Sequence, residues 1–163
     1  MKSIRFFDAN LLRALACVLM LCDHMWATIV PGNVWLTWIG RLAFPIFAFQ
    51  IAEGFLHTSN FRNYAVRLLI FGFLSEIPFD LVYSGTLFYP FHQNVMFTLL
   101  LGLLALKALD NAKQKHTTKA WLVGILLAAL CCLAAAVTFT DYGALGVATV
   151  ILFYLCRNFR FAW

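Results

Sequence analysis

The residues of this sequence that could do chemistry are charged and histidine side chains inside long apolar stretches. A charged side chain at the centre of a membrane-spanning helix costs about 2.5–3.5 kcal/mol, so it needs a partner or a function there. Five residues are placed in this way: Asp23, His24, Arg41, Glu76 and Asp80. Further polar residues fall at the ends of the apolar stretches: Glu53, His57, His92, Asn94 and Asp141. Histidine suits proton transfer near neutral pH, which makes His24 a candidate general base.

The spacing of Arg13 and His24 places both side chains on one face of a helix. They are eleven residues apart, which is three turns at about 3.67 residues per turn. At a rise of 1.5 Å per residue, the two positions are separated by about 16 Å along the helix axis. If Arg13 lies at the cytoplasmic surface, His24 lies deep in the membrane on the same face.

The other buried charges are expected at a similar depth. A second span that enters from outside brings Arg41 to about the level of His24, and a third that enters from inside brings Glu76 and Asp80 there or slightly further out. Pro78, between these two acids, is expected to loosen the helix and free backbone groups. Neighbouring residues on a helix point about 100° apart, so Asp23 should reach another helix rather than orient His24.

Two interpretations of these charges remain open. In the structural one, Arg41 only neutralises Asp23, Glu76 or Asp80 in an ionic lock, and His24 caps that network by hydrogen bonding. In the functional one, the same residues form a site. The density of charges and the presence of a histidine favour the site.

The composition indicates which class of protein holds these residues. Of 163 residues, 63% are hydrophobic and 12% are charged, whereas a soluble domain is about 45–50% apolar and about 25% charged. This excludes a soluble globular domain, a disordered chain and a nucleic-acid-binding module, and it predicts an all-α polytopic membrane protein. The five cysteines lie in apolar runs without a Cys-x2-Cys pattern, so we predict no metal site.

About six apolar stretches are candidate spans, because a helix needs about 20 residues to cross the hydrocarbon core. We predict a single transmembrane domain over residues 1–163, with the first stretch retained as a helix rather than cleaved as a signal. The predicted spans lie near Leu11–Val30, Val34–Ala52, Tyr64–Val82, Leu87–Leu106, Ala120–Phe139 and Tyr142–Cys156.

The basic residues give the orientation. Eleven of the twelve Lys and Arg residues fall before the first span, after the sixth, or at the second-to-third and fourth-to-fifth connections. The exception is Arg41, which lies inside the second span. By the positive-inside rule these connections are cytoplasmic, so both termini of the chain are predicted inside.

Several motifs together resemble the TraX family of bacterial membrane proteins. The sequence GRLAFPIFAFQIAEGFLHTSNF covers Gly40 to Phe61, and the Asp23-His24 pair precedes it by one helix. The further motifs are LSEIPFDL (74–81), NVMFTLLLGL (94–103) and DYGALGV (141–147). The basic-x10-His spacing also resembles the type 3 membrane acyltransferases. Members of the TraX family usually continue past the sixth span with further hydrophobic segments, so this chain is expected to be short at its C-terminus.

The resemblance implies an acyltransferase that takes an acetyl group from acetyl-CoA and modifies an amine or hydroxyl acceptor, such as a pilin N-terminus. The catalytic residues it implies are His24, Asp23 and Arg41. The residues implied in binding donor or acceptor are Arg13, Glu53, His57, Glu76, Asp80 and Asn94. The other expected partner is membrane lipid, and no nucleic acid partner or metal is expected. The alternative from a different class is a small membrane transporter or assembly factor without catalytic activity, in which the buried charges form a proton or substrate path.

Overall fold

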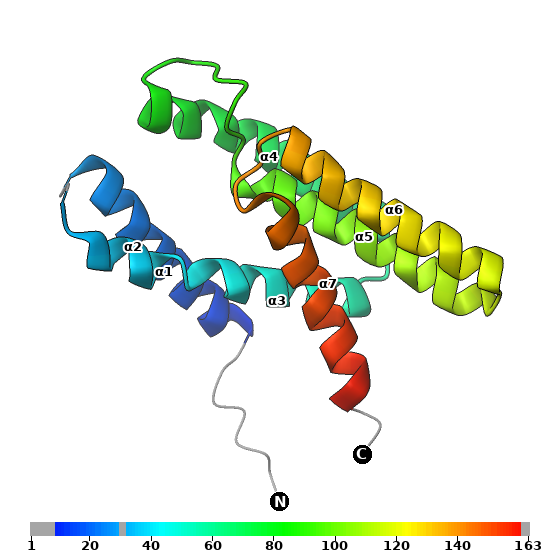
Figure 1. Cartoon of the computed structure of the whole chain (residues 1–163). Helices are drawn as coiled ribbons and strands as arrows, with labels where there is room; N and C mark the ends of the chain where they lie inside the picture. Colours follow the sequence, from blue (N-terminus) through cyan, green and yellow to red (C-terminus); the bar gives the residue numbers. More distant parts are fainter. Residues whose placement is uncertain (1–8, 30–31, 161–163) are drawn as a thin grey trace, which may run out of the picture. The chain divides into compact units, whose positions relative to one another are not determined.

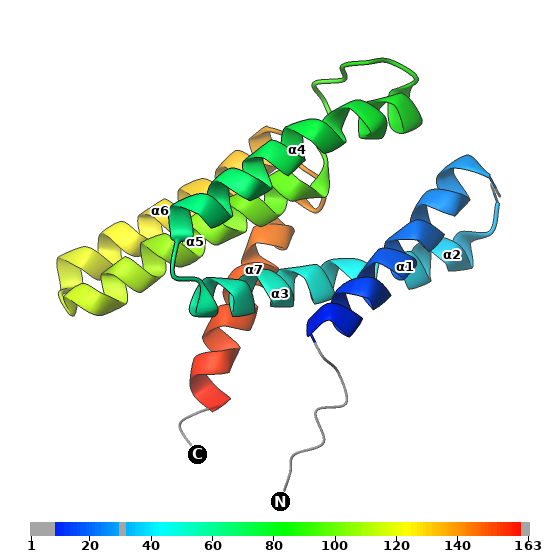
Figure 2. The ribbon, with the colours of Figure 1, turned by 180° about the vertical axis from the view of Figure 1, so that it is seen from behind.

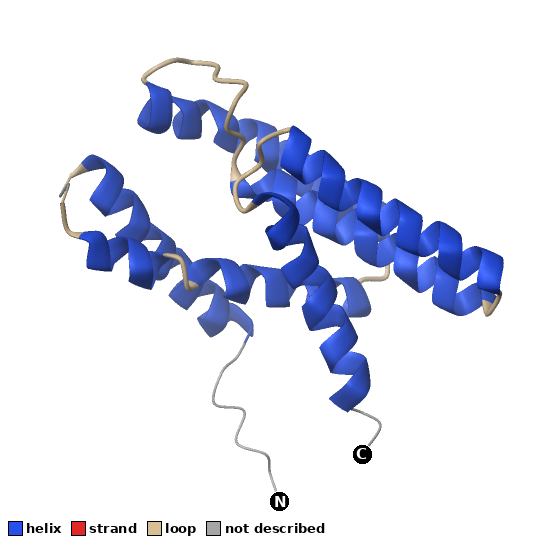
Figure 3. Cartoon of the chain, in the orientation of Figure 1, coloured by secondary structure: helices blue, strands red, loops and turns tan. Residues whose placement is uncertain are grey.

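The computed structural model describes residues 9–29 and 32–160 and is all-α, as the composition predicted (Figure 1; Figure 3). The described residues form no strand, and only Gln93 and Thr140 make an isolated bridge. Seven helices follow one another: α1 (Ala9–Thr28), α2 (Val34–Gly40), α3 (Ala43–His57), α4 (Phe61–Ser84), α5 (Val95–Lys115), α6 (Thr118–Val137) and α7 (Gly143–Arg160).

Each predicted span overlaps a helix or a pair of helices, but the fourth, Leu87–Leu106, was placed too early, because residues 87–94 lie in the connection and α5 begins at Val95. Three segments of the described chain are long and apolar enough to cross a membrane, namely Val34–His57, Val95–Lys115 and Thr118–Val137. The last helix contributes a shorter apolar segment, Gly143–Arg157. Large apolar side chains of α6, such as Leu122, are exposed over most of its length. Such a surface belongs in lipid rather than in water.

The second predicted span is not one continuous helix, and here the prediction needs correction. The chain turns at Arg41 and Leu42, between α2 and α3. Pro45 explains the break, because it has no N–H to donate to the carbonyl of Arg41 four residues earlier. The Arg41 carbonyl instead accepts from the N–H of Phe44, at 3.3 Å. Arg41 therefore sits at the break of an interrupted helix. Pro78 has no comparable effect, since α4 continues through it to Ser84.

The chain divides into two compact units, with the boundary inside α3 between Gln50 and Ile51. In unit 1 (residues 1–50), α1 packs against α2. The contact is close at Gly40, where an added Cβ would lie 2.4 Å from the Cβ of Asp23. Only a glycine at this position allows the two helices to approach so closely.

In unit 2 (residues 51–163), α5 is the central helix and packs against α4, α6 and α7 (Figure 2). Leu103 and Leu106 of α5 and Val147 and Val150 of α7 are fully buried. Gly102 lets Val150 approach, because an added Cβ would lie 2.9 Å from a Val150 methyl group. These contacts hold together the helices that carry the polar side chains described next.

Candidate functional site

The first group of polar residues lies on one face of α4. Glu76, Phe79, Asp80 and Tyr83 are spaced at i, i+3, i+4 and i+7, so they form a stripe of alternating acidic and aromatic side chains. Asp80 is 1% exposed. The connection between α4 and α5 folds back over this stripe, because its backbone and side chains bond to both acids.

Asn94 makes the main link between that connection and α4. Its side-chain amide donates to the carbonyl of Gly72 at 2.8 Å and to the carboxylate of Glu76. Its backbone N–H also donates to Glu76, at 3.2 Å. Its side-chain oxygen accepts from the N–H of Met96 at 2.9 Å and so caps the start of α5. Asn94 is predicted to bind substrate, but the hydrogen bonds it makes here position α4 against α5.

Three buried polar atoms in this region have no hydrogen-bond partner among the described residues. They are Oε1 of Glu76, Oδ1 of Asp80 and Nδ1 of His92. The second carboxylate oxygen of Asp80 does accept a bond, from the N–H of Tyr89 at 2.9 Å. A buried polar atom without a partner costs about 1–3 kcal/mol, more for a charged group. These atoms are therefore where a bound polar group or a water molecule would be stabilised.

Two aromatic rings of α4 pack against His92, which is half-buried. Its ring centroid lies 4.3 Å from that of Tyr83 and 5.2 Å from that of Phe79. Its Nε2 lies 3.9 Å from Oδ1 of Asp141. The backbone of Asp141 pairs with Gln93, its N–H donating to the Gln93 carbonyl at 2.8 Å. Two connections that are far apart in the sequence thus meet beside the α4 stripe.

We call this set of residues the outer acidic cluster: Glu76, Asp80, His92, Asn94 and Asp141. Sequence reasoning assigned site roles to Glu76, Asp80 and Asn94 but not to His92 or Asp141. The available signal was that His92 and Asp141 fall at the same end of their predicted spans as Asp80. Charge type and position alone did not show that they approach each other.

A second polar group lies near the other end of α4, around the α3–α4 connection. Glu53 forms an ion pair with Arg157 of α7. The ring Nδ1 of His57 donates to the carbonyl of Glu53, at 2.8 Å, and lies 3.9 Å from its carboxylate. Phe55 packs edge-on against Phe61 and belongs to the same end of the helix. From Phe61 to Asp80 along α4 is about 28 Å, so unit 2 does not bring Glu53 and His57 together with Glu76 and Asp80.

The remaining predicted site residues belong to unit 1. Arg13 and His24 are exposed on α1, and Nη1 of Arg13 donates to the side-chain oxygen of Asn10 at 3.4 Å. Asp23 is half-buried against α2, and its Oδ1 is buried without a hydrogen-bond partner among the described residues. Within the described residues, exposed Arg41 forms no ion pair with Asp23. The expected approach of Arg41 to Glu76 or Asp80 joins the two units and stays a prediction.

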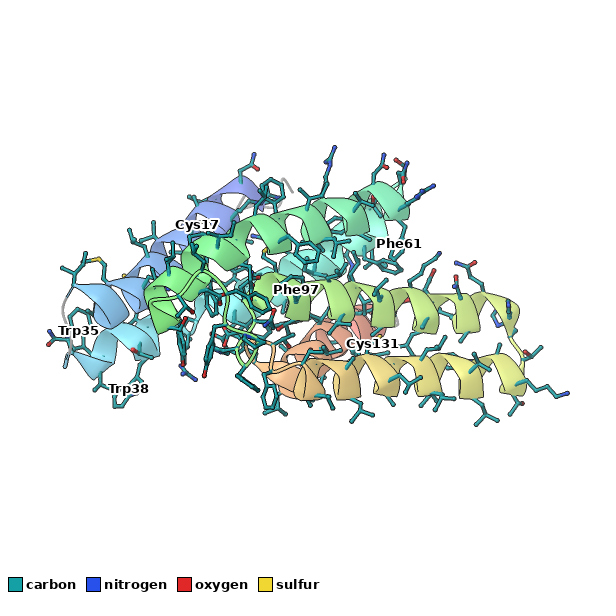
Figure 4. The ribbon with its side chains drawn as sticks, turned by 90° about the horizontal axis from the view of Figure 1, so that it is seen from above. Cys17, Trp35, Trp38, Phe61, Phe97 and Cys131 are labelled. Atoms are coloured by element: carbon teal, nitrogen blue, oxygen red, sulfur yellow. The ribbon has the colours of Figure 1, made fainter. Side chains whose placement is uncertain are left out.

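Besides the two polar groups, unit 2 contains packed aromatic rings and free thiols. Phe97 of α5, which is labelled in Figure 4, packs edge-on against Phe73 of α4, and the ring centroids are 5.4 Å apart. Cys131 and Cys132 of α6 are half-buried, and all five cysteines of the chain are free thiols. The described residues contain no group of three or more His, Cys, Asp or Glu side chains that could hold a metal ion.

Comparison with known proteins identifies the family. The model of the TraX protein family matches residues 8–163. The chain belongs to the TraX family. It is 37% identical over 111 residues to a protein of Dichelobacter nodosus named as a probable fimbrial assembly protein, FimC of serogroup H1. That match covers 61% of this chain and 46% of the relative, so the chain spans about half the length of that relative. No solved structure matches the chain.

The family match and the apolar helices together support a membrane protein of the TraX family. The family match confirms the resemblance predicted from the motifs, and it extends over nearly the whole chain. The helices long and apolar enough to cross a membrane support the predicted multi-pass arrangement.

Proposed function

We propose that this TraX-family protein transfers an acetyl group from acetyl-CoA to an amine or hydroxyl acceptor, such as a pilin N-terminus, in the bacterial inner membrane. The observation that carries the proposal is the placement of Arg13 and His24 on one helix, both exposed, in a chain that matches the TraX family. The fimbrial name of the Dichelobacter nodosus relative supports a pilin-type acceptor.

His24 is the general base of the proposed reaction. Its imidazole removes a proton from the acceptor as the acceptor nitrogen or oxygen attacks the carbonyl carbon of the acetyl thioester. A bond forms from the acceptor to that carbon, and the carbon–sulfur bond breaks. The sulfur of CoA leaves with the electron pair and takes up the proton held by His24. His24 fits this role because an exposed imidazole can reach a bound acceptor.

The two arginines have separate roles in this scheme. Arg41 stabilises the negative charge that develops on the carbonyl oxygen, and a guanidinium is suited to this because it stays ionised at any working pH. Its place at the break between α2 and α3 supports the assignment, since interrupted helices often carry binding groups in membrane proteins. Arg13, about 16 Å away from His24 along α1, binds the phosphates of CoA.

The outer acidic cluster binds the acceptor in this proposal. Glu76 and Asp80 each keep one buried carboxylate oxygen without a partner. The nearest basic residue on α4 is Arg67, nine residues before Glu76 and about 14 Å away along the helix. An ammonium group of the acceptor would satisfy these oxygens, and the rings of Phe79 and Tyr83 would favour a cation further. Binding of substrate by Glu53 and His57 stays a prediction.

The test is transfer of radiolabel from acetyl-CoA to a pilin-type peptide by protein in membranes. His24→Ala should abolish transfer, because no other group in the proposed scheme removes the proton. His116→Ala is the matched control, since His116 is an exposed histidine at the turn between α5 and α6. Transfer that continues at the normal rate in His24→Ala would refute the assignment of His24 as the base.

A second function, that of an assembly factor without chemistry, is favoured by the name of the relative, which refers only to fimbrial assembly. In that case pilus or fimbrial assembly in cells should survive His24→Ala, and purified protein should show no thermal shift with acetyl-CoA. In the acetyltransferase case, both the thermal shift and the loss of labelled product are expected. The two functions are therefore separated by the same variant.

A further inference from the structure

A groove between α5 and α6, close to the turn that joins them, has no part in the proposed reaction. Its volume is about 400 Å³. One side is formed by residues of α5, among them Asn111 and Lys115, and the other by residues of α6, among them Lys119 and Leu127. The two helices lie side by side along their length (Figure 1; Figure 4). The groove therefore follows the helix pair from the turn toward the middle of α6.

The charged end of this groove is separate from its mainly apolar end. Lys115, Thr117 and Lys119 line it at the turn. Ala120, Val123, Gly124 and Leu127 line it further along α6, together with two alanines and one polar residue, Asn111, of α5. Leu127 is eight residues beyond Lys119, which is about 12 Å along the helix. A ligand that fills the groove needs an anionic end and an apolar end.

The floor of the groove is narrow because small residues of α5 and α6 pack against each other there. Gly124 packs directly on α5, because an added Cβ would lie 2.7 Å from the Cβ of Ala112 and 3.0 Å from the carbonyl oxygen of Ala108. Small residues at this contact leave no long side chains to fill the space above it. The exposed residues Val123 and Leu127 then form an apolar wall beside the floor.

The charges at the mouth of the groove are not neutralised by nearby acids. Lys115 and Lys119 are exposed, and neither forms an ion pair within residues 9–29 and 32–160. Asp110 is the one acidic residue between α5's start and α6's end, and it accepts bonds from Gln114 at 2.7 Å and from Tyr154 at 3.2 Å. The turn thus carries a net positive charge at the predicted cytoplasmic interface.

We propose that this groove binds an anionic phospholipid of the cytoplasmic leaflet. Lys115 and Lys119 hold the headgroup phosphate, and one acyl chain lies along Val123 and Leu127. Basic pockets between membrane helices on the cytoplasmic side are known to take such headgroups. An acyl chain suits the apolar floor better than a sugar or a base does, because it has no polar atoms that would lose their hydrogen bonds there.

The test measures lipid retention by purified protein in detergent, by native mass spectrometry with titrated phosphatidylglycerol or phosphatidylcholine. Phosphatidylglycerol should be retained at lower concentrations than phosphatidylcholine. The double substitution Lys115→Gln and Lys119→Gln should weaken phosphatidylglycerol binding about 30-fold, which corresponds to about 1 kcal/mol for each lysine. Lys113→Gln is the matched control, because Lys113 lies on the same exposed turn of α5 but does not line the groove.

A second variant separates a lipid from a free phosphate or from CoA. Val123→Trp fills the apolar part, so it should weaken phosphatidylglycerol without changing the binding of inorganic phosphate. Equal retention of the two lipids, or no effect of the lysine substitutions, would overturn the proposal. Displacement of the lipid by CoA at equal concentration, with Val123→Trp having no effect, would identify a phosphate site and also overturn it. Neither result bears on acetyl transfer, which is measured separately.

Discussion

The contact between Gly40 and Asp23 leads to a prediction whose size can be worked from the structure. In Gly40→Ala, the new Cβ would lie 2.4 Å from the Cβ of Asp23, 2.8 Å from its backbone nitrogen and 2.9 Å from its Cα. Ordinary carbon contacts lie at about 3.5–4.0 Å. The helices α1 and α2 must therefore separate by about 1 Å, because backbone atoms cannot turn aside as a side chain can.

The expected cost is at the upper end of the range for overpacking, about 3 kcal/mol. A change of 1 kcal/mol shifts the melting temperature of a chain of this size by about 2–4 °C. Gly40→Ala should then lower the melting temperature in detergent by about 6–12 °C. It should also reduce acetyl transfer, because the separation displaces Asp23 and the neighbouring His24 relative to Arg41.

Gly54→Ala is the matched control for this measurement. An added Cβ at Gly54 would meet the hydroxyl oxygen of Tyr64 at 2.7 Å, which is the far end of a side chain that can shift. A local readout is the rate at which maleimide labels Cys22, half-buried on α1 beside Asp23, in a protein whose other cysteines are replaced by alanine. This rate should rise in Gly40→Ala. Equal stability and equal Cys22 labelling in the two glycine variants would refute the close approach of α1 and α2.

Three further predictions concern hydrogen bonds and charged side chains of unit 2. Asn94→Ala should lower the free energy of unfolding by about 2–4 kcal/mol, since it removes a helix cap and leaves the Glu76 carboxylate without its amide partner. The control Asn60→Ala, which removes an exposed cap, should cost about 1 kcal/mol. Melting temperatures of the two variants measure the difference. Glu53→Gln with Arg157→Gln should be less destabilising than the sum of the single variants, by about 1 kcal/mol in a double-mutant cycle of unfolding. Asp80→Asn should raise the KM for an amine acceptor with little change in the KM for acetyl-CoA; an unchanged acceptor KM would remove Asp80 from the acceptor site.

Much of the fold could be predicted from the sequence, because each apolar run in this chain is long enough to specify its own helix. The break at Arg41 was not predicted, although Pro45, which causes it, lies within the motif from Gly40 to Phe61. The reason is that the segment from Val34 to His57 is long and apolar enough to cross a membrane, and apolar length is a stronger pattern than one proline. Pro78 illustrates the opposite case, since α4 keeps its helical path there. A proline alone therefore does not determine whether a helix breaks.

The candidate site was harder to predict, because it depends on contacts between residues far apart in the chain. Glu53 was assigned to substrate from its position, yet its partner is Arg157, 104 residues later, and only the packing of unit 2 brings the two together. Asn94 was assigned for its polarity, although a helix-capping asparagine after a turn is also a local signal for a structural role. His92 was left out of the site because its partner Asp141 is on a different connection.

The outer acidic cluster limits the ways in which this protein can work. Oε1 of Glu76 and Oδ1 of Asp80 are buried without a hydrogen-bond partner among the described residues, and a buried polar atom without a partner is unfavourable. His92 is the basic side chain of the same cluster, and its ring packs against those of Tyr83 and Phe79. In the proposed reaction a donor group of the acceptor supplies the missing partner of these oxygens. The two acids then select the acceptor, so their loss should weaken acceptor binding and leave acetyl-CoA binding unchanged.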